Sequence, residues 1–260
     1  MTDRPLWRAS DQRVLEVASV ALRLEPGRWA FADRHAADID AHWARRRQEC
    51  PHFFNGAVHL LADYEIAPGG RLVARFVRSD FKSFLYWREH GWPDSRVMDA
   101  FGSALIVSRG GGLLLGRQRS GHLNGGLTYP PGGFIDARDL GPDGTIDLDG
   151  SVMREIREEV GLSPEQLQRR PGYIVTCAGP VCSIGVPYVA RCPDAELRAV
   201  AERHLAADPD PELADVLLLA PGPVPNSLAM PAYARVLIAG LADLESFRRD
   251  PLLPLDTRPE

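Results

Sequence analysis

One short stretch of the chain, residues 154–161, reads Arg-Glu-Ile-Arg-Glu-Glu-Val-Gly. Wound as an α-helix, it places Glu155, Glu158 and Glu159 on one face, because side chains three and four residues apart are neighbours. Like charges at this spacing repel, and the last turn before a glycine C-cap favours cations over carboxylates. A hard divalent cation such as Mg²⁺ would neutralise the three acids, since it is typically bound by carboxylates together with phosphate oxygens of a substrate.

The same helix has two other faces. One is apolar and is expected to pack inward; it consists of Val152, Met153, Ile156 and Val160. The other carries Arg154 and Arg157, which could pair with the acids and leave an ordinary solvated, acidic surface helix. The choice between a cation site and a solvated helix depends on the residues upstream.

Those upstream residues make the region resemble the Nudix box. Residues 154–162 match the second part of the box without exception, and Gly132-Gly133 precede them. Gly133 followed by Asp139 matches the first part, with Asp in place of the Glu of the family pattern. Between Asp139 and Arg154 the chain carries extra residues, which we interpret as an insertion within residues 140–153.

The insertion begins Leu-Gly-Pro-Asp-Gly-Thr at residues 140–145, which is typical turn chemistry. We predict a flexible or substrate-facing loop there, whose shortening would alter KM more than stability. Asp147 or Asp149 is expected to cap the helix that follows.

The resemblance implies an α/β/α sandwich with a mixed sheet and hydrolysis of the diphosphate bond in a nucleoside diphosphate linked to another group. It also implies Mg²⁺ as the cofactor, with Mn²⁺ as an alternative. The metal ligands would be three box carboxylates and one backbone carbonyl: Glu155, Glu158, Glu159 and Gly132. Arg154 would aim a carboxylate, and the catalytic base would be Glu155 or a later acid, for which Glu212 is our candidate. Glu158 completes the catalytic set.

Four residues leading into the glycine pair are candidates for binding substrate: Arg117, Arg119, Asn124 and Tyr129. Arginine forks suit phosphate oxygens, so the two arginines could hold the diphosphate. The alternative is that they are solvated arginines at strand ends. We expect His122 to be a surface loop residue.

The N-terminal third adds a second resemblance. Residues 43–47, 53–56 and 78–84 resemble the module that precedes the catalytic domain in UDP-glucose and UDP-galactose pyrophosphatases, which implies release of UMP and a sugar 1-phosphate. ADP-ribose or a dinucleotide is the alternative substrate. Four aromatic residues near the junction either form the core of this module or stack on a base: Phe81, Phe84, Tyr86 and Trp87.

Two other functional classes use the same fold. A non-catalytic ligand-binding regulator usually lacks box carboxylates, and none is missing here. Isopentenyl diphosphate isomerisation would need a cysteine and metal-binding histidines, and Cys177 and Cys182 lack that setting.

These residues require elements that position them. All five tryptophans lie within the first 92 residues, which predicts a separate α+β module at 1–98, before a Nudix domain at 99–250 and a loose tail at 251–260. In the module we expect a strand, a helix, a hairpin and a helix, at residues 15–24, 36–50, 55–78 and 83–90. In the second domain we expect strands and a final helix, at residues 104–107, 113–116, 173–178, 186–190, 216–220 and 227–244.

Composition limits the remaining possibilities. With 260 residues, 45% hydrophobic and a net charge of −5, the chain is expected to be globular, with neither nucleic acid nor a membrane as its partner. A small-molecule substrate is expected, and a homodimer is left open. The N-terminus does not resemble a signal peptide, and the four cysteines show no metal-binding spacing, so free thiols and a cytoplasmic location are expected.

Overall fold

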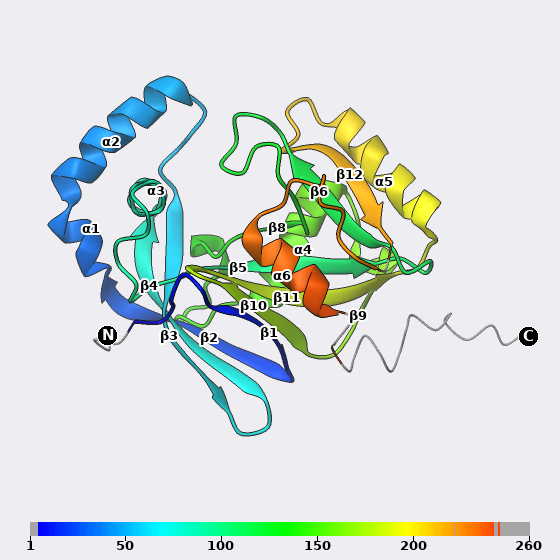
Figure 1. The fold of residues 1–260 in the computed structure, drawn as a ribbon, viewed down its shortest axis with the longest axis horizontal. Coiled ribbons are helices and arrows are strands. Elements are labelled where there is room, and N and C mark those ends of the chain that lie inside the picture. The colour runs from blue at the N-terminus through cyan, green and yellow to red at the C-terminus, as the bar shows by residue number, and fades with distance from the viewer. Residues whose placement is uncertain (1–4, 221, 242–243, 245–260) are drawn as a thin grey trace, which may run out of the picture.

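A computed structural model describes residues 5–220, 222–241 and 244. The chain is a mixed α/β protein with one large mixed sheet and a second, smaller sheet at its N-terminal end, which confirms the expected fold class (Figure 1). The expected tail at residues 251–260 lies outside the described residues. No helix in the described ranges is both long and apolar enough to cross a membrane.

The smaller sheet has the strand order β2-β4-β3, with helices beside it. Its elements are β2 (Ser19–Arg28), α1 (Ala30–Arg34), α2 (Ala36–Glu49), β3 (Ala57–Ala67), β4 (Arg71–Asp80) and α3 (Phe81–Glu89). Strands β3 and β4 form the expected antiparallel hairpin, whose turn contains Gly69 and Gly70 with positive φ. Trp29, Phe84 and Trp87 are fully buried between the sheet and the helices, so this module has the aromatic core that the sequence predicted.

The large sheet has the strand order β1-β10-β11-β5-β6-β12. These strands are β1 (Gln12–Val17), β5 (Asp99–Val107), β6 (Leu113–Gln118), β10 (Tyr173–Ala178), β11 (Val181–Ala190) and β12 (Leu213–Leu219), with short additions at β7 (Thr128–Tyr129), β8 (Gly132–Phe134) and β9 (Leu167–Arg169). Strands β11 and β5 are parallel and the other pairs are antiparallel.

The expected single strand over residues 15–24 is wrong. The chain bends at Ala18, whose amide donates to the carbonyl of Gly70, and the two halves enter different sheets. Strand β1 pairs with β10 in the large sheet, whereas β2 pairs with β4 in the small one. A domain boundary at residue 98 would therefore separate the two sheets, except that β1 precedes the boundary and belongs to the large sheet.

Helices cover both faces of the large sheet. Its helical elements are η1 (Ala137–Asp139), α4 (Leu148–Glu155), η2 (Ile156–Val160), η3 (Pro164–Gln166), α5 (Asp194–Ala207) and α6 (Ala232–Leu241). A Cβ on Gly102 would meet Val152 of α4, whereas the adjacent Phe101 contacts Tyr233 of α6, so the two helices lie on opposite faces of β5 (Figure 1). Helix α5 was not expected from the sequence, and α6 starts five residues later than expected, after Pro231.

The insertion is not a substrate-facing loop, contrary to expectation. The amide of Leu24 donates to the carbonyl of Gly144, and the amide of Ile146 donates to that of Leu22, so the loop lies along β2 of the small sheet. None of residues 140–145 lines the pocket described below. Asp147 caps α4 by accepting from the amide of Gly150 at 2.9 Å, as expected.

We therefore expect a substitution at Gly144 to destabilise the protein. Gly144 has φ +82° and a Cβ there would lie 3.1 Å from the carbonyl oxygen of Leu24, so Gly144→Ala combines left-handed strain with a backbone clash. Gly69→Ala is the matched control, because Gly69 has φ +77° but open space around it. Denaturant unfolding should show a loss of about 1–2 kcal/mol for the control and a larger loss for Gly144→Ala. Equal losses would mean that the docking of the insertion on β2 contributes nothing.

Candidate active site

The acidic stretch is helical, as predicted, but its last turn is a π-turn and not the α-helical turn that the sequence predicted. Helix α4 ends at Glu155, and Ile156–Val160 form a single π-turn that ends at Gly161 with φ 68°, the expected glycine C-cap. In a π-turn, backbone hydrogen bonds join residues five positions apart, and such turns often occur at functional sites. The apolar face packs inward as expected, with Val152, Ile156 and Val160 fully buried.

The three carboxylates do not share one face equally. Glu159 is buried, with 6% of its surface exposed, and the side chain of Glu155 is 13% exposed, whereas that of Glu158 is 53% exposed. Glu158 instead lies 3.8 Å from the guanidinium of Arg138. Two carboxylates thus lie inside the protein, and the third lies at the surface beside Arg138.

Two glycines of β8 hold the buried carboxylates in place. The amide of Gly132 donates to Oε2 of Glu159 at 3.0 Å. A Cβ on Gly133 would lie 2.6 Å from Cδ of Glu155, so any larger residue would push this carboxylate away. The glycine pair therefore serves to bring the backbone of β8 against the two acids.

The electrostatics of the site are unfavourable without a counter-charge. Burial, followed by the negative charge of Glu158, raises the pKa of Glu155 to about 7. Burial, followed by the charges of Glu155 and Glu212, raises the pKa of Glu159 well above its usual value. Burial away from water disfavours the charged form of both carboxyls, and the neighbouring negative charges add to this effect.

Asp139 and Arg154, which lie before and after the insertion in sequence, are in direct contact. Arg154 donates to Oδ1 of Asp139 at 2.7 Å, and the Asp139 side chain is completely buried. The second oxygen of Asp139 accepts from the amide of Asp136 at 2.8 Å. Arg154 also lies 3.9 Å from Glu155. Arg154 thus pairs with a carboxylate, as expected, and Asp139 is the link between β8 and α4.

The carboxylates suit a hard cation, although they are not arranged as a finished site. Within the described residues, no three His, Cys, Asp or Glu side chains are placed so that they could hold one ion as they stand. Their oxygens are nevertheless the donors that Mg²⁺ and Mn²⁺ prefer, and their mutual repulsion is what a cation would relieve. Rotation of the exposed Glu158 toward Glu155 and Glu159 would supply a third ligand.

A pocket of about 460 Å³ contains all three glutamates together with Glu212. Both modules form its walls. The small-sheet module contributes His52, Phe53, Phe54, Phe81 and Arg88, and the large-sheet domain contributes Asp99, Phe101, Tyr129, Phe134 and Tyr233, among others. Acids and flat aromatic side chains therefore line the same pocket.

The structure corrects part of the expected substrate-binding set. Asn124 and Tyr129 line the pocket, but Arg117 and Arg119 do not. Arg117 pairs with Asp215 at 2.5 Å on the outer part of β6 and β12, and Arg119 pairs with Asp210 at 2.8 Å. Both pairs are exposed to solvent, which is the alternative that the sequence left open, although Asp210 itself borders the pocket.

Two other arginines, Arg88 and Arg138, line the pocket and were missed. Arg88 comes from α3 of the small-sheet module, and Arg138 lies in the short helix η1 after Phe134. Neither has a spacing signal in the sequence, because their distance to the acids is set by how the two modules pack. His122, expected in a surface loop, also borders the pocket.

The aromatic residues near the junction divide into two groups. Phe84 and Trp87 are fully buried in the small-sheet core and cannot reach a ligand. Phe81 is half buried and lines the pocket, whereas Tyr86 stacks on His90 with ring centroids 4.0 Å apart. Phe54, which the sequence did not single out for stacking, is 76% exposed at the pocket.

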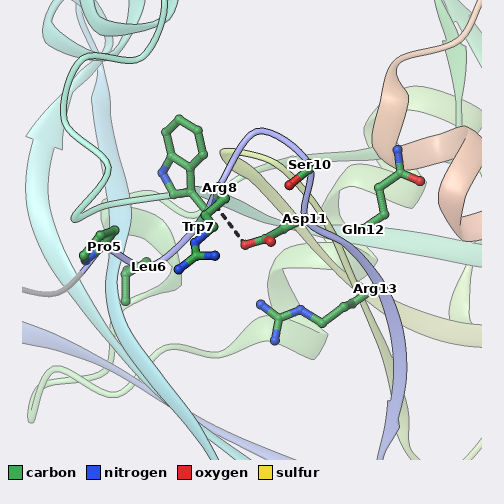
Figure 2. A pocket seen from close by; sticks show the side chains of 8 residues that line it. All are labelled: Pro5, Leu6, Trp7, Arg8, Ser10, Asp11, Gln12 and Arg13. Carbon is green, nitrogen blue, oxygen red and sulfur yellow. Dashed lines mark hydrogen bonds between the residues drawn. The ribbon is translucent and has the colours of Figure 1, made fainter.

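A second hollow lies at the start of the described chain, among residues 5–8 and 10–13 (Figure 2). Its main interaction is the amide of Arg8, which donates to Oδ2 of Asp11 at 2.8 Å. None of the acids of the box reaches it. We assign the chemistry to the first pocket.

Comparison with known sequences gives no match. No family model matches the chain. No curated protein matches it.

Comparison with solved structures finds chains that match this one at low sequence identity. One is a Nudix hydrolase from M. smegmatis, RenU, with 19% identity and a TM-score of 0.39 over 61% of this chain and 88% of that chain. Another is the MutT protein of Methanosarcina mazei Go1, with 21% identity and a TM-score of 0.37 over 59% of this chain and 95% of that one. A third is a bifunctional NMN adenylyltransferase/ADP ribose pyrophosphatase of Francisella tularensis, with 16% identity and a TM-score of 0.37 over 62% of this chain and 45% of that one.

Removing one buried charge should stabilise the metal-free protein. We expect Glu159→Gln to raise the free energy of unfolding by about 1–2 kcal/mol at pH 8 in chelator, because it ends the repulsion with Glu155 while an amide oxygen still accepts from Gly132. The melting temperature should rise by about 2–4 °C per kcal/mol. Excess Mg²⁺ should stabilise the wild type and leave Glu159→Gln almost unchanged. Glu202→Gln, on the exposed face of α5, is the control; a destabilised Glu159→Gln protein would contradict the charge argument.

Proposed function

We propose that this chain is a divalent-cation-dependent hydrolase that cleaves the diphosphate bond of a nucleoside diphosphate linked to another group. The observation that supports it most directly is the pocket that holds Glu155, Glu158 and Glu159 beside flat apolar side chains. A diphosphate needs positive charge, whereas a base needs flat apolar partners, and one pocket offers a place for both.

Each residue of the site has a task in this proposal. Glu159, bound by the amide of Gly132, and Glu155, packed against Gly133, would hold Mg²⁺ or Mn²⁺ together with the exposed Glu158 and the carbonyl of Gly132. When bound, the cation would neutralise phosphate oxygens and acidify a water molecule.

Proton transfer falls to a carboxylate near the attacking water. Glu155 is the first candidate for the general base, because it lines the pocket beside the other two glutamates. Arg154 lies 3.9 Å from Glu155 and is itself held by Asp139, so it can orient this carboxylate. Glu212 is the second candidate base, because it lines the same pocket from the start of β12. Arg138, which lies 3.8 Å from Glu158, is the pocket cation that can meet phosphate oxygens, a task first expected of Arg117 and Arg119.

We further propose a UDP-sugar as the substrate, with UMP and a sugar 1-phosphate as products. The support is that the small-sheet module, which carries the resemblance to UDP-sugar pyrophosphatases, supplies one wall of the pocket through Phe53, Phe54 and Phe81. ADP-ribose or a dinucleotide is the alternative. Mass identification of products from UDP-sugars, ADP-ribose, NADH and dinucleoside polyphosphates would discriminate between them.

A non-catalytic, ligand-binding role is the competing class. One observation favours it: within the described ranges, no three acidic side chains stand ready around a single ion position. Ligand binding without cation-dependent turnover on the whole substrate panel would support this alternative.

Removal of the reorienting carboxylate should abolish turnover and spare the fold. Glu158 is half exposed, so Glu158→Gln should leave the melting temperature within about 1 °C while kcat falls by about 10²–10³-fold or more. Glu202→Gln again serves as the control, with unchanged kcat. Wild-type turnover by Glu158→Gln, or full activity of the wild type in excess chelator, would refute the hydrolase proposal.

The exposed aromatic at the pocket mouth should affect substrate choice. Phe54 is 76% exposed, so Phe54→Ala should not change stability, but it removes a flat partner for a base. We expect kcat/KM for UDP-glucose and for ADP-ribose to fall by unequal factors of about 3–20, since the two bases differ in stacking area. Ile66→Ala is the control, because Ile66 is exposed but lies away from the pocket. An unchanged kcat/KM for both substrates would show that Phe54 does not contact them.

A further inference from the structure

Asp99, the first residue of β5, has a carboxyl group whose presence no element of the fold explains. The residue is only 6% exposed, yet it lines the pocket. In the part of the chain that the structure describes, no hydrogen-bond partner reaches its buried Oδ1. Burial raises the pKa of Asp99 to about 7, and the neighbouring Arg88 opposes this only in part.

A buried carboxyl without a partner is costly. An unpaired polar group in a protein interior costs about 1–3 kcal/mol, and an unpaired charge costs more. An apolar residue at this position would avoid that cost. This unfavourable free energy is offset if a ligand in the pocket supplies the missing hydrogen bonds.

The groups around Asp99 show what kind of ligand fits. Arg88 lies close enough to act on its charge, but within the described residues no hydrogen bond reaches Oδ1 of Asp99. Instead Arg88 donates to Oδ1 of Asn124 at 2.7 Å. Tyr129 also lies near Asn124, and Tyr233 lies near Asp99. A carboxyl group, which accepts hydrogen bonds when ionised, and a guanidinium, which only donates, thus line the same pocket as amide and phenol groups.

This mixture suits hydroxyl groups. A hydroxyl both donates and accepts, so it can donate to the Asp99 carboxylate and accept from Arg88 or Asn124. A carboxylate has two oxygens and can accept from two hydroxyls on adjacent carbons. A uracil edge is less suitable, because carbonyl oxygens flank its single N–H and would face the carboxylate.

The position of Asp99 relative to the acids agrees with this. Ser103 pairs with Gly132 across β5 and β8, and Asp99 lies four residues before Ser103 on the same strand. Besides burial, the charges of Asp99 and Glu159 both help to raise the pKa of Tyr233, so both carboxylates lie near this one side chain. One molecule bound in the pocket can therefore reach Asp99 and the glutamates together.

We propose that Asp99, supported by Arg88 and Asn124, forms a subsite that binds vicinal hydroxyls of a sugar attached to the diphosphate. This assignment rests on the proposed hydrolase function. Two sugars could supply such hydroxyls, the sugar carried by the diphosphate and the ribose of the nucleoside. Asp99 is a specificity residue in this proposal and takes no part in bond breaking.

The test combines substrate hydroxyl deletions with substitutions of Asp99. The substrates are UDP-glucose, its 2-, 3- and 4-deoxyglucose counterparts, 2′-deoxyuridine diphosphate glucose and ADP-ribose. We expect loss of the recognised hydroxyl to lower kcat/KM of the wild type by about 10-fold or more, as for a hydrogen bond to a charged group. In Asp99→Asn and Asp99→Ala the same deletion should change kcat/KM by less than about 3-fold. Which deletion matters identifies the sugar that is bound.

The effect of these substitutions on folding is measured separately. Because no hydrogen bond within the described residues reaches the buried Oδ1 of Asp99, both variants should melt at or above the wild-type temperature. Asp215→Asn is the matched control, since Asp215 pairs with Arg117 outside the pocket, and it should keep the wild-type response to every deletion.

The outcomes separate this subsite from the hydrolase proposal. Hydrolysis with equal sensitivity to hydroxyl deletion in the wild type and Asp99→Asn would overturn the subsite alone. A dependence on the base and not on any hydroxyl would also overturn it. If the wild type hydrolyses nothing, calorimetric binding of the same compounds decides: hydroxyl-dependent affinity that is lost in Asp99→Asn supports the subsite while the hydrolase proposal fails, and affinity without that dependence overturns both.

Discussion

The buried ion pair between Asp139 and Arg154 is the interaction on which the site depends. The Asp139 side chain is completely enclosed, so its charge would be strongly unfavourable without the guanidinium 2.7 Å away. The pair links the segment after β8 to helix α4. Through it, the glycines of β8 and the carboxylates of the helix keep one relative position although an insertion separates them in sequence.

That framework allows the protein to bury charge that it does not neutralise. Glu155 and Glu159 are held beside each other, and the raised pKa of both shows that the metal-free state is electrostatically strained. Backbone contacts resist their separation, because Gly132 binds one carboxylate and Gly133 leaves room for the other. Stored repulsion of this kind favours binding of a cation over a closed, neutral surface.

The small-sheet module completes the pocket without contributing to the acidic cluster. Strand β2 is tied to the insertion at Leu22 and Leu24, and α3 brings Arg88 and Phe81 to the pocket wall. The two modules are therefore in contact at the insertion, and residues of both also line the pocket. The residues of the proposed chemistry thus belong to the large-sheet domain, whereas residues of both modules can contact the ligand.

The sequence alone determined the features that depend on neighbours along the chain. The box carboxylates, the glycine cap at Gly161, the hairpin at residues 68–70 and strand β10 all follow from local spacing and turn chemistry, and each is present. The π-turn at 156–160 was missed because an α-helix and a π-turn share the same local pattern.

Only the tertiary structure decided which distant residues meet. Arg117 and Arg119 were expected in the pocket but pair with acids at the surface, while Arg88 and Asp99 reach it from other elements. The insertion lies on β2 instead of facing substrate. Periodicity shows which face of an element is apolar, but it does not specify which element will cover that face. That choice depends on sheet register and on packing between segments far apart in the chain.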